Sequence, residues 1–289
     1  MSIEFRTQAI YDIELILRRE VTNNNNIKKD FSKLKYYYGR DLATLLADKI
    51  SSVYPLFQKQ VFIDIVDRKT NDLKLKERIK IITETLHDYL PLPYPDVVKI
   101  FISILGPPNP YETGMFKEGY WIMPIAYFVE THGIDYFAIS TDAIYQITQR
   151  NTGEYAVRPF VVKYPKETAS LMLKWSYDAN VHVRRLSSEG IRPRLPWAKK
   201  LDQFVSDPRP ILPILENLKQ DESLFVRKSV ANNINDILKD NYDIGIKLLK
   251  KWSGSQNTNT QWIIKHALRN ELKRGNTEAI DLIQFNKRN

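Results

Sequence analysis

The chain has 289 residues, with 43 Lys and Arg against 34 Asp and Glu, so its formal net charge is +9 and its pI is about 9.4. It has no cysteine and four scattered histidines, which excludes disulfides, thiol nucleophiles and cysteine-ligated metals and argues against a histidine zinc site. We therefore expect no metal and no cofactor, and the positive charge favours a polyanionic partner.

The N-terminal third contains the first helical patterns. Residues 1–30, with an asparagine run at 23–26, are expected to form a peripheral helix and a loop. Within residues 73–90, apolar side chains recur with the 3.6-residue period of an amphipathic helix. Prolines then follow at 91–95 and 107–110, where helices should end. The longest apolar run, 122–129, is too short to cross a membrane, and the charged N-terminus does not resemble a signal peptide, so we expect a cytoplasmic protein.

A weak repeat marks the C-terminal half. An apolar anchor followed by basic residues recurs at Val183, Val226 and Ile263, and Asp221 and Ser223 can cap the helix that contains Val226. Two-helix units that recur about every 40 residues are typical of HEAT solenoids, which stack into a superhelix with a concave face. The sequence predicts an all-α, HEAT-like solenoid that forms one domain over residues 1–289.

A row of polar side chains is predicted along the second helix of each unit, because residues four and three positions apart share a helix face. The row reads Arg185, Glu189 and Arg192, then Lys228, Asn232 and Asn235, then Lys265, Arg269 and the apolar Leu272. It predicts a basic concave groove, and ordinary solvated helix faces remain the alternative.

Three segments contain the candidate chemistry. Residues 181–197 hold four arginines and Trp197, and arginine guanidiniums suit phosphate. Trp197 could stack on a sugar or base, although filling a hydrophobic seam is the commoner use of a tryptophan. In residues 148–160, Glu154 is expected in the first turn of a helix, where it belongs to the capping group or pairs with Arg158. Residues 229–236 place three asparagines and Asp236 in an apolar-periodic helix, which indicates polar contacts.

These segments carry a family resemblance. The strings RRLSSEGIRPRLPW, VRKSVANNINDILKD and TQRNTGEYAVRPF resemble the AlkC branch of the AlkC/AlkD-like DNA alkylation repair family, the alkylpurine DNA glycosylases. The resemblance covers roughly residues 30–285 and is strongest over 148–240. Members of the AlkD branch have a tryptophan where this chain has Asn232, which puts a stacking aromatic at that position in doubt.

The resemblance implies a DNA glycosylase of base excision repair. Such an enzyme hydrolyses the N-glycosidic bond of cationic alkylated bases in double-stranded DNA, such as 3-methyladenine or 3-methylcytosine, without a base-flipping pocket. A carboxylate would stabilise the oxocarbenium-like sugar, and the candidates are Glu154, then Glu118 and then Asp236. We also expect a monomer that works on nucleoid DNA in a bacterial cytoplasm.

The remaining site residues follow from the residue pattern and the resemblance together. The expected DNA contacts are Arg158, Arg184, Arg185, Arg192, Arg194, Lys228, Asn232, Asn235, Lys265 and Arg269. The candidates for shielding the lesion are Trp121, Trp197 and Trp262. The alternatives are a non-catalytic solenoid that binds DNA structure, and a protein-interaction scaffold, whose concave face would be apolar.

Overall fold

The computed structural model describes residues 35–113 and 119–288. The expected N-terminal helix and loop and the candidate Glu118 lie outside these residues. Within them the secondary structure is helical, with no strand, so the all-α prediction is confirmed. None of the described helices is long and apolar enough to cross a membrane.

The N-terminal half consists of α3 (Arg40–Val53), α4 (Lys59–Thr70), α5 (Leu75–Tyr89), α6 (Tyr94–Ile104), η1 (Tyr120–Ile122), α7 (Met123–His132), α8 (Phe137–Thr148) and α9 (Arg158–Lys163). The C-terminal half consists of α10 (Pro165–Trp175), α11 (Val181–Glu189), α12 (Asp202–Ser206), η2 (Arg209–Ile211), α13 (Leu212–Leu218), α14 (Leu224–Asp240), α15 (Tyr242–Trp252), α16 (Thr258–Ala267), α17 (Arg269–Lys273) and α18 (Thr277–Arg288).

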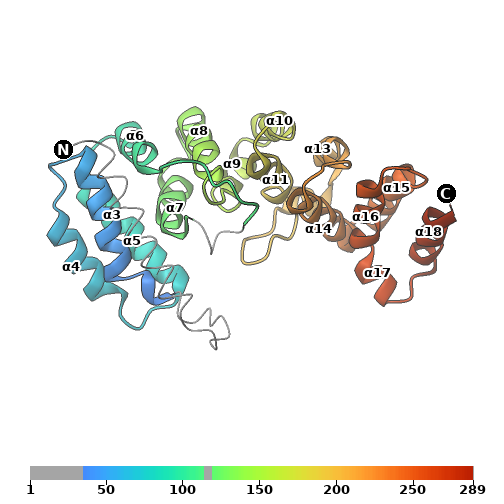
Figure 1. The fold of residues 1–289 in the computed structure, drawn as a ribbon, viewed down its shortest axis with the longest axis horizontal. Coiled ribbons are helices and arrows are strands. Elements are labelled where there is room, and N and C mark those ends of the chain that lie inside the picture. The colour runs from blue at the N-terminus through green and yellow to red at the C-terminus, as the bar shows by residue number, and fades with distance from the viewer. Residues whose placement is uncertain (1–34, 114–118, 289) are drawn as a thin grey trace.

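The helices stack in two rows that form a curved array, with α3–α5 at one end and α18 at the other (Figure 1). One row contains α6, α8, α10 and α13, and the other contains α5, α7, α11, α14 and α16 (Figure 1). In the second row α5 packs on α7, α11 on α14, and α14 on α16. This stacking of helical hairpins is the arrangement that the repeat predicted.

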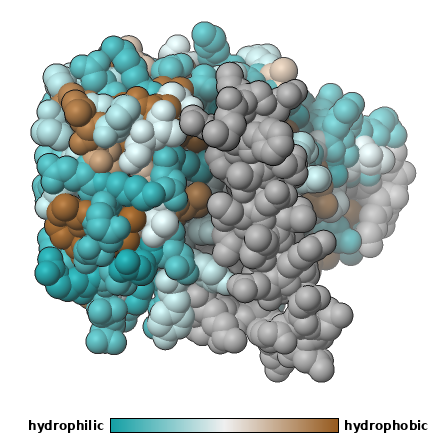
Figure 2. Space-filling model, turned by 60° about the vertical axis from the view of Figure 1, so that its left-hand side comes forward, coloured by the Kyte–Doolittle hydropathy of each residue, from teal (hydrophilic) through white to brown (hydrophobic). Residues whose placement is uncertain are grey.

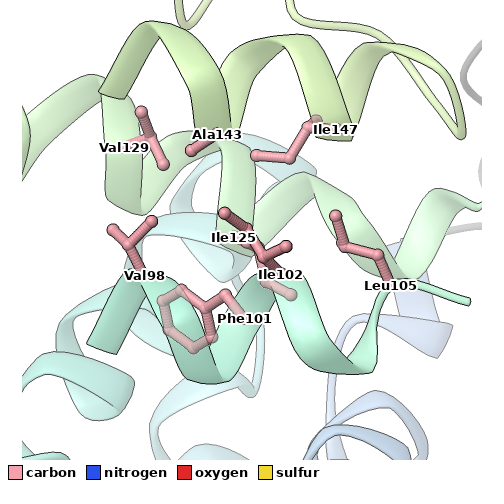
Figure 3. Close-up of a pocket in the computed structure, with 8 residues that line it drawn as sticks. All are labelled: Val98, Phe101, Ile102, Leu105, Ile125, Val129, Ala143 and Ile147. Carbon is pink, nitrogen blue, oxygen red and sulfur yellow. The ribbon is translucent and has the colours of Figure 1, made fainter. Parts of the chain in front are cut away.

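The hydrophobic core runs continuously between the two rows. The periodic residues of α5 lie in it: Ile79, Ile82 and Leu86 are buried, and Glu77 accepts a hydrogen bond from the Lys74 amide at the helix start. Figure 3 shows the core between α6, α7 and α8, where a narrow crevice is lined only by apolar side chains such as Val98 and Phe101. Outside the grey atoms, the N-terminal end of the surface is largely hydrophilic with separate hydrophobic spots (Figure 2).

Three equivalent helix starts define the repeat. The caps Asn180, Ser223 and Asn257 each accept hydrogen bonds from two backbone amides, at the starts of α11, α14 and α16. Three positions after each cap lies a buried anchor, which is Val183, Val226 or Thr260.

The third anchor is therefore Thr260 and not Ile263, so the predicted alignment of the third unit is wrong. The sequence reasoning followed the apolar residues, whereas the cap that begins α16 is Asn257 and the anchor is a buried threonine. Trp262, not Lys265, is thus the residue equivalent to Arg185 and Lys228. The row of the third unit becomes Trp262, His266 and Arg269.

A proline-containing strap, residues 106–112, connects units that are not neighbours in the sequence. At one end the Gly106 carbonyl accepts a hydrogen bond from Arg150 Nε at 2.6 Å, and the Asn109 amide donates to the Gln149 carbonyl at 2.8 Å. At the other end Glu112 Oε2 accepts from Ser223 Oγ at 2.8 Å, at the start of α14. Both attachment points lie next to the segments that contain the candidate site residues.

Candidate active site

Glu154 lies in the connection between α8 and α9. Helix α9 begins only at Arg158, so Glu154 precedes the helix and is not part of its first turn, where we expected it from the spacing. The connection is compact because Gly153 packs against α8, where an added Cβ would lie 2.6 Å from Thr148 Oγ1. Glu154 is only 4% exposed.

The Glu154 carboxylate is held through one of its two oxygens. Oε2 accepts a hydrogen bond from Thr152 Oγ1 at 3.0 Å and lies 2.6 Å from Arg185 Nη1. Oε1 accepts no hydrogen bond from the described residues, and it is not among the enclosed polar atoms that lack a partner. The carboxylate is thus fixed in position while one oxygen remains open to solvent.

Arg185 begins a line of alternating buried charges. Its second nitrogen, Nη2, lies 3.7 Å from Glu189 Oε1, and the same oxygen accepts from Arg192 Nη1 at 2.9 Å. Arg192 Nε then donates to Asp236 Oδ2 at 2.9 Å. The structure therefore brings two of the candidate carboxylates, Glu154 and Asp236, into one network, although they are 82 positions apart.

The opposite charges of the network favour the charged forms of Glu189 and Arg185. Burial acts to raise the pKa of Glu189, but the guanidiniums of Arg185 and Arg192 outweigh it, and the pKa is lowered. Burial likewise opposes the charge of Arg185, and the carboxylates of Glu154 and Glu189 raise its pKa. Each buried charge is offset by an opposite one, which is the condition for keeping ions away from water.

Arg158 was expected to contact DNA, but its guanidinium binds backbone carbonyls within the protein. It is 6% exposed, and its guanidinium donates to the backbone carbonyls of Gly190 at 3.0 Å, Arg192 at 2.9 Å and Lys199 at 2.6 Å. Burial, and then Arg192, lower its pKa to about 10. Arg158 therefore fixes the loop of residues 190–201 and does not pair with Glu154.

This loop presents Trp197 to solvent. Trp197 is 70% exposed and has a φ of +66°, a left-handed conformation that is strained for a bulky side chain. Its carbonyl accepts from Lys76 Nζ of α5 at 2.5 Å, and the Pro196 carbonyl accepts from Tyr155 OH at 3.3 Å. A loop fixed from several sides thus holds one aromatic ring outside the core.

The other two candidate tryptophans, Trp121 and Trp262, are less accessible. Trp121 is 5% exposed and belongs to the core, so it cannot shield a lesion without rearrangement. Trp262 is half-buried, stacks on His266 with ring centroids 4.7 Å apart, and has Arg227 over its ring at 5.8 Å. Trp197 is the most exposed of the three candidates.

Several of the expected DNA contacts are already paired within the protein. Arg184 holds Asp221 through Nε at 2.7 Å, and Arg194 holds Asp240 through Nε at 2.6 Å. Asn235 is buried, and its amide donates to the Ala267 carbonyl at 2.8 Å. These side chains join neighbouring units, which explains why polar residues recur in the second helices without all facing a ligand.

The remaining members of the expected groove are more accessible. Lys228 and Lys265 are exposed and form no hydrogen bond or ion pair with the described residues, whereas Asn232 accepts from Arg269 Nη2 at 2.8 Å. The sequence reasoning missed Thr152, Tyr155 and Lys76. Thr152 and Tyr155 flank Glu154 in the quoted motif, but no local signal connects Lys76 with a loop 121 residues away.

Two cavities of the described surface lie away from this network. One is the apolar crevice between α6, α7 and α8, and the other is an open depression between α10 and α13, lined by Leu173, Tyr177 and Glu216 among others. Neither contains Glu154 or Asp236. Within the described ranges, no three His, Asp or Glu side chains gather into a group that could hold a metal ion.

Comparison with known proteins gives three related findings. The model of the family "DNA alkylation repair enzyme" matches residues 151–270, the part that contains the charge network. Uncharacterized protein YhaZ of Bacillus subtilis (strain 168) is 41% identical over 253 residues, which are 87% of this chain and 68% of that protein.

A solved structure agrees with them. The alkylpurine DNA glycosylase AlkC of Pseudomonas fluorescens, bound to DNA containing an abasic site analog, matches with a TM-score of 0.78 and 35% identity. The match covers 86% of this chain and 68% of that one. The fold, the matched segment around Glu154 and these similarities agree, and the chain belongs to the AlkC branch of the DNA alkylation repair enzyme family.

Proposed function

We propose that this protein is a DNA glycosylase that hydrolyses the N-glycosidic bond of cationic alkylated bases, such as 3-methyladenine or 3-methylcytosine, in double-stranded DNA. The observation that carries the proposal is the Glu154 carboxylate, fixed through Oε2 by Arg185 and Thr152 while Oε1 stays open. The similarity to a glycosylase that was solved with DNA containing an abasic site analog supports the same activity.

In the proposed mechanism the alkylated base is already a cation, so it departs as a neutral molecule with both electrons of its bond to C1′. The sugar becomes oxocarbenium-like, and the Glu154 carboxylate stabilises this positive charge at close range. Water then adds to C1′ and passes its proton to the carboxylate and on to solvent. A strong general acid is unnecessary, because the leaving group needs no protonation.

Arg185 holds Glu154 in place for this step. Its guanidinium takes up one carboxylate oxygen, and the Glu189–Arg192–Asp236 chain holds the guanidinium in turn. In this proposal Glu154 stabilises the sugar, Arg185 positions Glu154, and Asp236 acts through Arg192. The order of the expected carboxylates therefore stays Glu154 before Asp236.

DNA would lie along the accessible cations of α14, α16 and α17. Lys228 and Lys265 are exposed, and Arg269 is half-buried beside Asn232, so these residues remain the proposed phosphate contacts. Trp197 is the proposed aromatic next to the lesion, because it is exposed and its loop is fixed. We further propose that the chain acts as one solenoid domain and as a monomer on nucleoid DNA in the cytoplasm.

The test is release of free base from a methylated duplex by the wild type and by Glu154→Gln. We expect the variant to bind DNA normally and to release base about 100- to 1,000-fold more slowly, the usual cost of losing one electrostatic stabiliser. Asp236→Asn identifies the carboxylate that acts, and Glu189→Gln is the matched control for disturbing the network without changing Glu154.

Wild-type protein that binds DNA but releases no alkylated base would contradict the proposal. The protein would then be a non-catalytic DNA-binding solenoid. Equal losses in Glu154→Gln and Glu189→Gln would instead limit Glu154 to a structural part in the network.

A further inference from the structure

The turns that precede α11, α14 and α16 are equivalent in detail. In each turn a side-chain oxygen two residues before the cap accepts from the cap's own backbone amide: Asp178 Oδ1 at 2.7 Å, Asp221 Oδ1 at 2.9 Å and Ser255 Oγ at 3.2 Å. The third turn thus has a hydroxyl where the first two have a carboxylate.

Arg184 and Arg227 occupy the same position, four residues after their caps, and bind their own turns in the same way. Arg184 Nη1 donates to the carbonyls of Asp178 and Ala179 at 3.0 and 2.9 Å. Arg227 Nη1 donates to the carbonyls of Asp221 and Glu222 at 3.0 and 2.7 Å. The two guanidiniums are therefore oriented alike with respect to the next turn along the solenoid.

The next turn offers different acceptors to Arg184 and to Arg227. Arg184 donates to the Asp221 carboxylate through Nε at 2.7 Å and Nη2 at 3.3 Å. The turn that follows Arg227 offers Ser255 instead. Arg227 Nε is buried and has no acceptor among the described residues, and no hydrogen bond from its Nη2 to them is formed. A buried Nε–H without an acceptor is costly, because it has given up its hydrogen bond to water.

The surroundings of Arg227 suit an oxyanion. The next residue, Lys228, is exposed, the Trp262 ring centroid lies 5.8 Å from the guanidinium, and the His266 ring is stacked on Trp262. Burial, and then the nearby cations Arg269 and Lys228, lower the pKa of His266, which indicates a positive local field. A phosphate beside Arg227 would meet cations and one aromatic ring.

We propose that Arg227 binds a backbone phosphate of DNA at the turn before α16, in the place that the Asp221 carboxylate occupies beside Arg184. The phosphate supplies the acceptors that Ser255 is too short and uncharged to supply, and a guanidinium binds phosphate and carboxylate with the same two-pronged geometry. The proposal rests on the proposed function only for DNA as the ligand.

Two substitutions test the proposal, one at the arginine and one at the residue that would compete with the phosphate. Arg227→Gln removes the cation, and Ser255→Asp installs the carboxylate that the repeat lacks. We expect each to weaken binding of an undamaged, fluorescently labelled duplex about 10-fold in anisotropy titrations. Each should also reduce the slope of log K against log salt by about 0.9, the value for one phosphate. Ser255→Asp should in addition raise the melting temperature, because Arg227 gains a partner.

Three controls isolate the contact. Thr258→Asp adds the same charge three residues further on, at the exposed first residue of α16, and should change the binding slope less than Ser255→Asp. Ser255→Asp in the Arg227→Gln background should no longer raise the melting temperature. Arg184→Gln removes the equivalent arginine, whose acceptor is already within the protein, so it should lower stability and leave the salt slope unchanged.

The proposal is overturned if Arg227→Gln keeps the wild-type slope, or if Ser255→Asp and Thr258→Asp weaken binding equally. Inorganic phosphate provides the second arm. If it raises the melting temperature of the wild type but not of Arg227→Gln, while DNA binding is the same in both, the site takes free phosphate and not DNA. Because the duplex is undamaged, a failure of base release leaves this test unaffected.

Discussion

Replacing Arg185 by methionine removes the cation between Glu154 and Glu189 and keeps a side chain of similar length. Both carboxylates are nearly buried, with 6% and 7% of their side chains exposed, and Arg185 itself is 17% exposed. Breaking a buried ion pair by removing one partner costs about 3–5 kcal/mol, because the other charge stays away from water. At about 2–4 °C per kcal/mol for a chain of this size, we expect the melting temperature to fall by roughly 6–20 °C.

The loss of melting temperature in Arg185→Met should depend on pH. In the wild type the pKa of Glu189 is lowered, so the network stabilises the fold above the ordinary glutamate pKa, and this stability is lost as the pH falls through the lowered value. In Arg185→Met, the effect of burial on the pKa of Glu189 is opposed only by Arg192 and by the hydrogen bond from Ser229, so Glu189 protonates at a higher pH. The gap between the two melting temperatures should therefore be widest near pH 7 and narrow towards pH 4.

The assay is thermal melting of both proteins across that pH range, with Arg185→Met combined with Glu189→Gln as a second variant. The double variant should recover part of the loss, because one of the two stranded charges is gone. A single variant that melts within 1–2 °C of the wild type, or with the same deficit at every pH, would refute the idea that the network stabilises through paired charges.

Two further predictions concern residues close to the site. Burial raises the pKa of Glu130 to about 7, although Lys76 and Arg158 act to lower it. The folded protein therefore resists ionisation of Glu130, and it loses stability as the pH rises from the ordinary glutamate range through 7. Glu130→Gln should therefore stabilise the protein by about 1 kcal/mol at pH 8 and have no effect near pH 4; equal melting shifts at both pH values would contradict this. Trp197→Gly should be more stable than Trp197→Ala by about 1 kcal/mol, because glycine adopts a positive φ without strain. Base release should fall in both variants. Wild-type rates of base release in either variant would show that Trp197 is not part of the site.

The sequence predicts the fold better than it predicts the use of each side chain. Helical periods, prolines and caps are local signals, so the α5 helix and the Ser223 cap could be predicted from residues within one turn of them. The alignment of the third unit could not, because its cap is Asn257 and its anchor is a buried threonine. Which arginines face solvent depends on partners in other units: Asp221 for Arg184, and three carbonyls for Arg158. Spacing places a residue on a helix face, but it does not report what the next unit offers to that face.

The strap of residues 106–112 changes how the array should come apart. In a linear repeat protein each unit contacts only its neighbours, so segments can fray one after another from the ends. Here the hydrogen bonds of Arg150 and Ser223 to the strap link the α8–α9 connection to the start of α14. Amide hydrogens of α11 and α14 should then exchange with deuterium together, as one cooperative block, and more slowly than those of α3 or α18. Such a block would keep Glu154, Arg185 and Asp236 in register during fluctuations that open the outer helices.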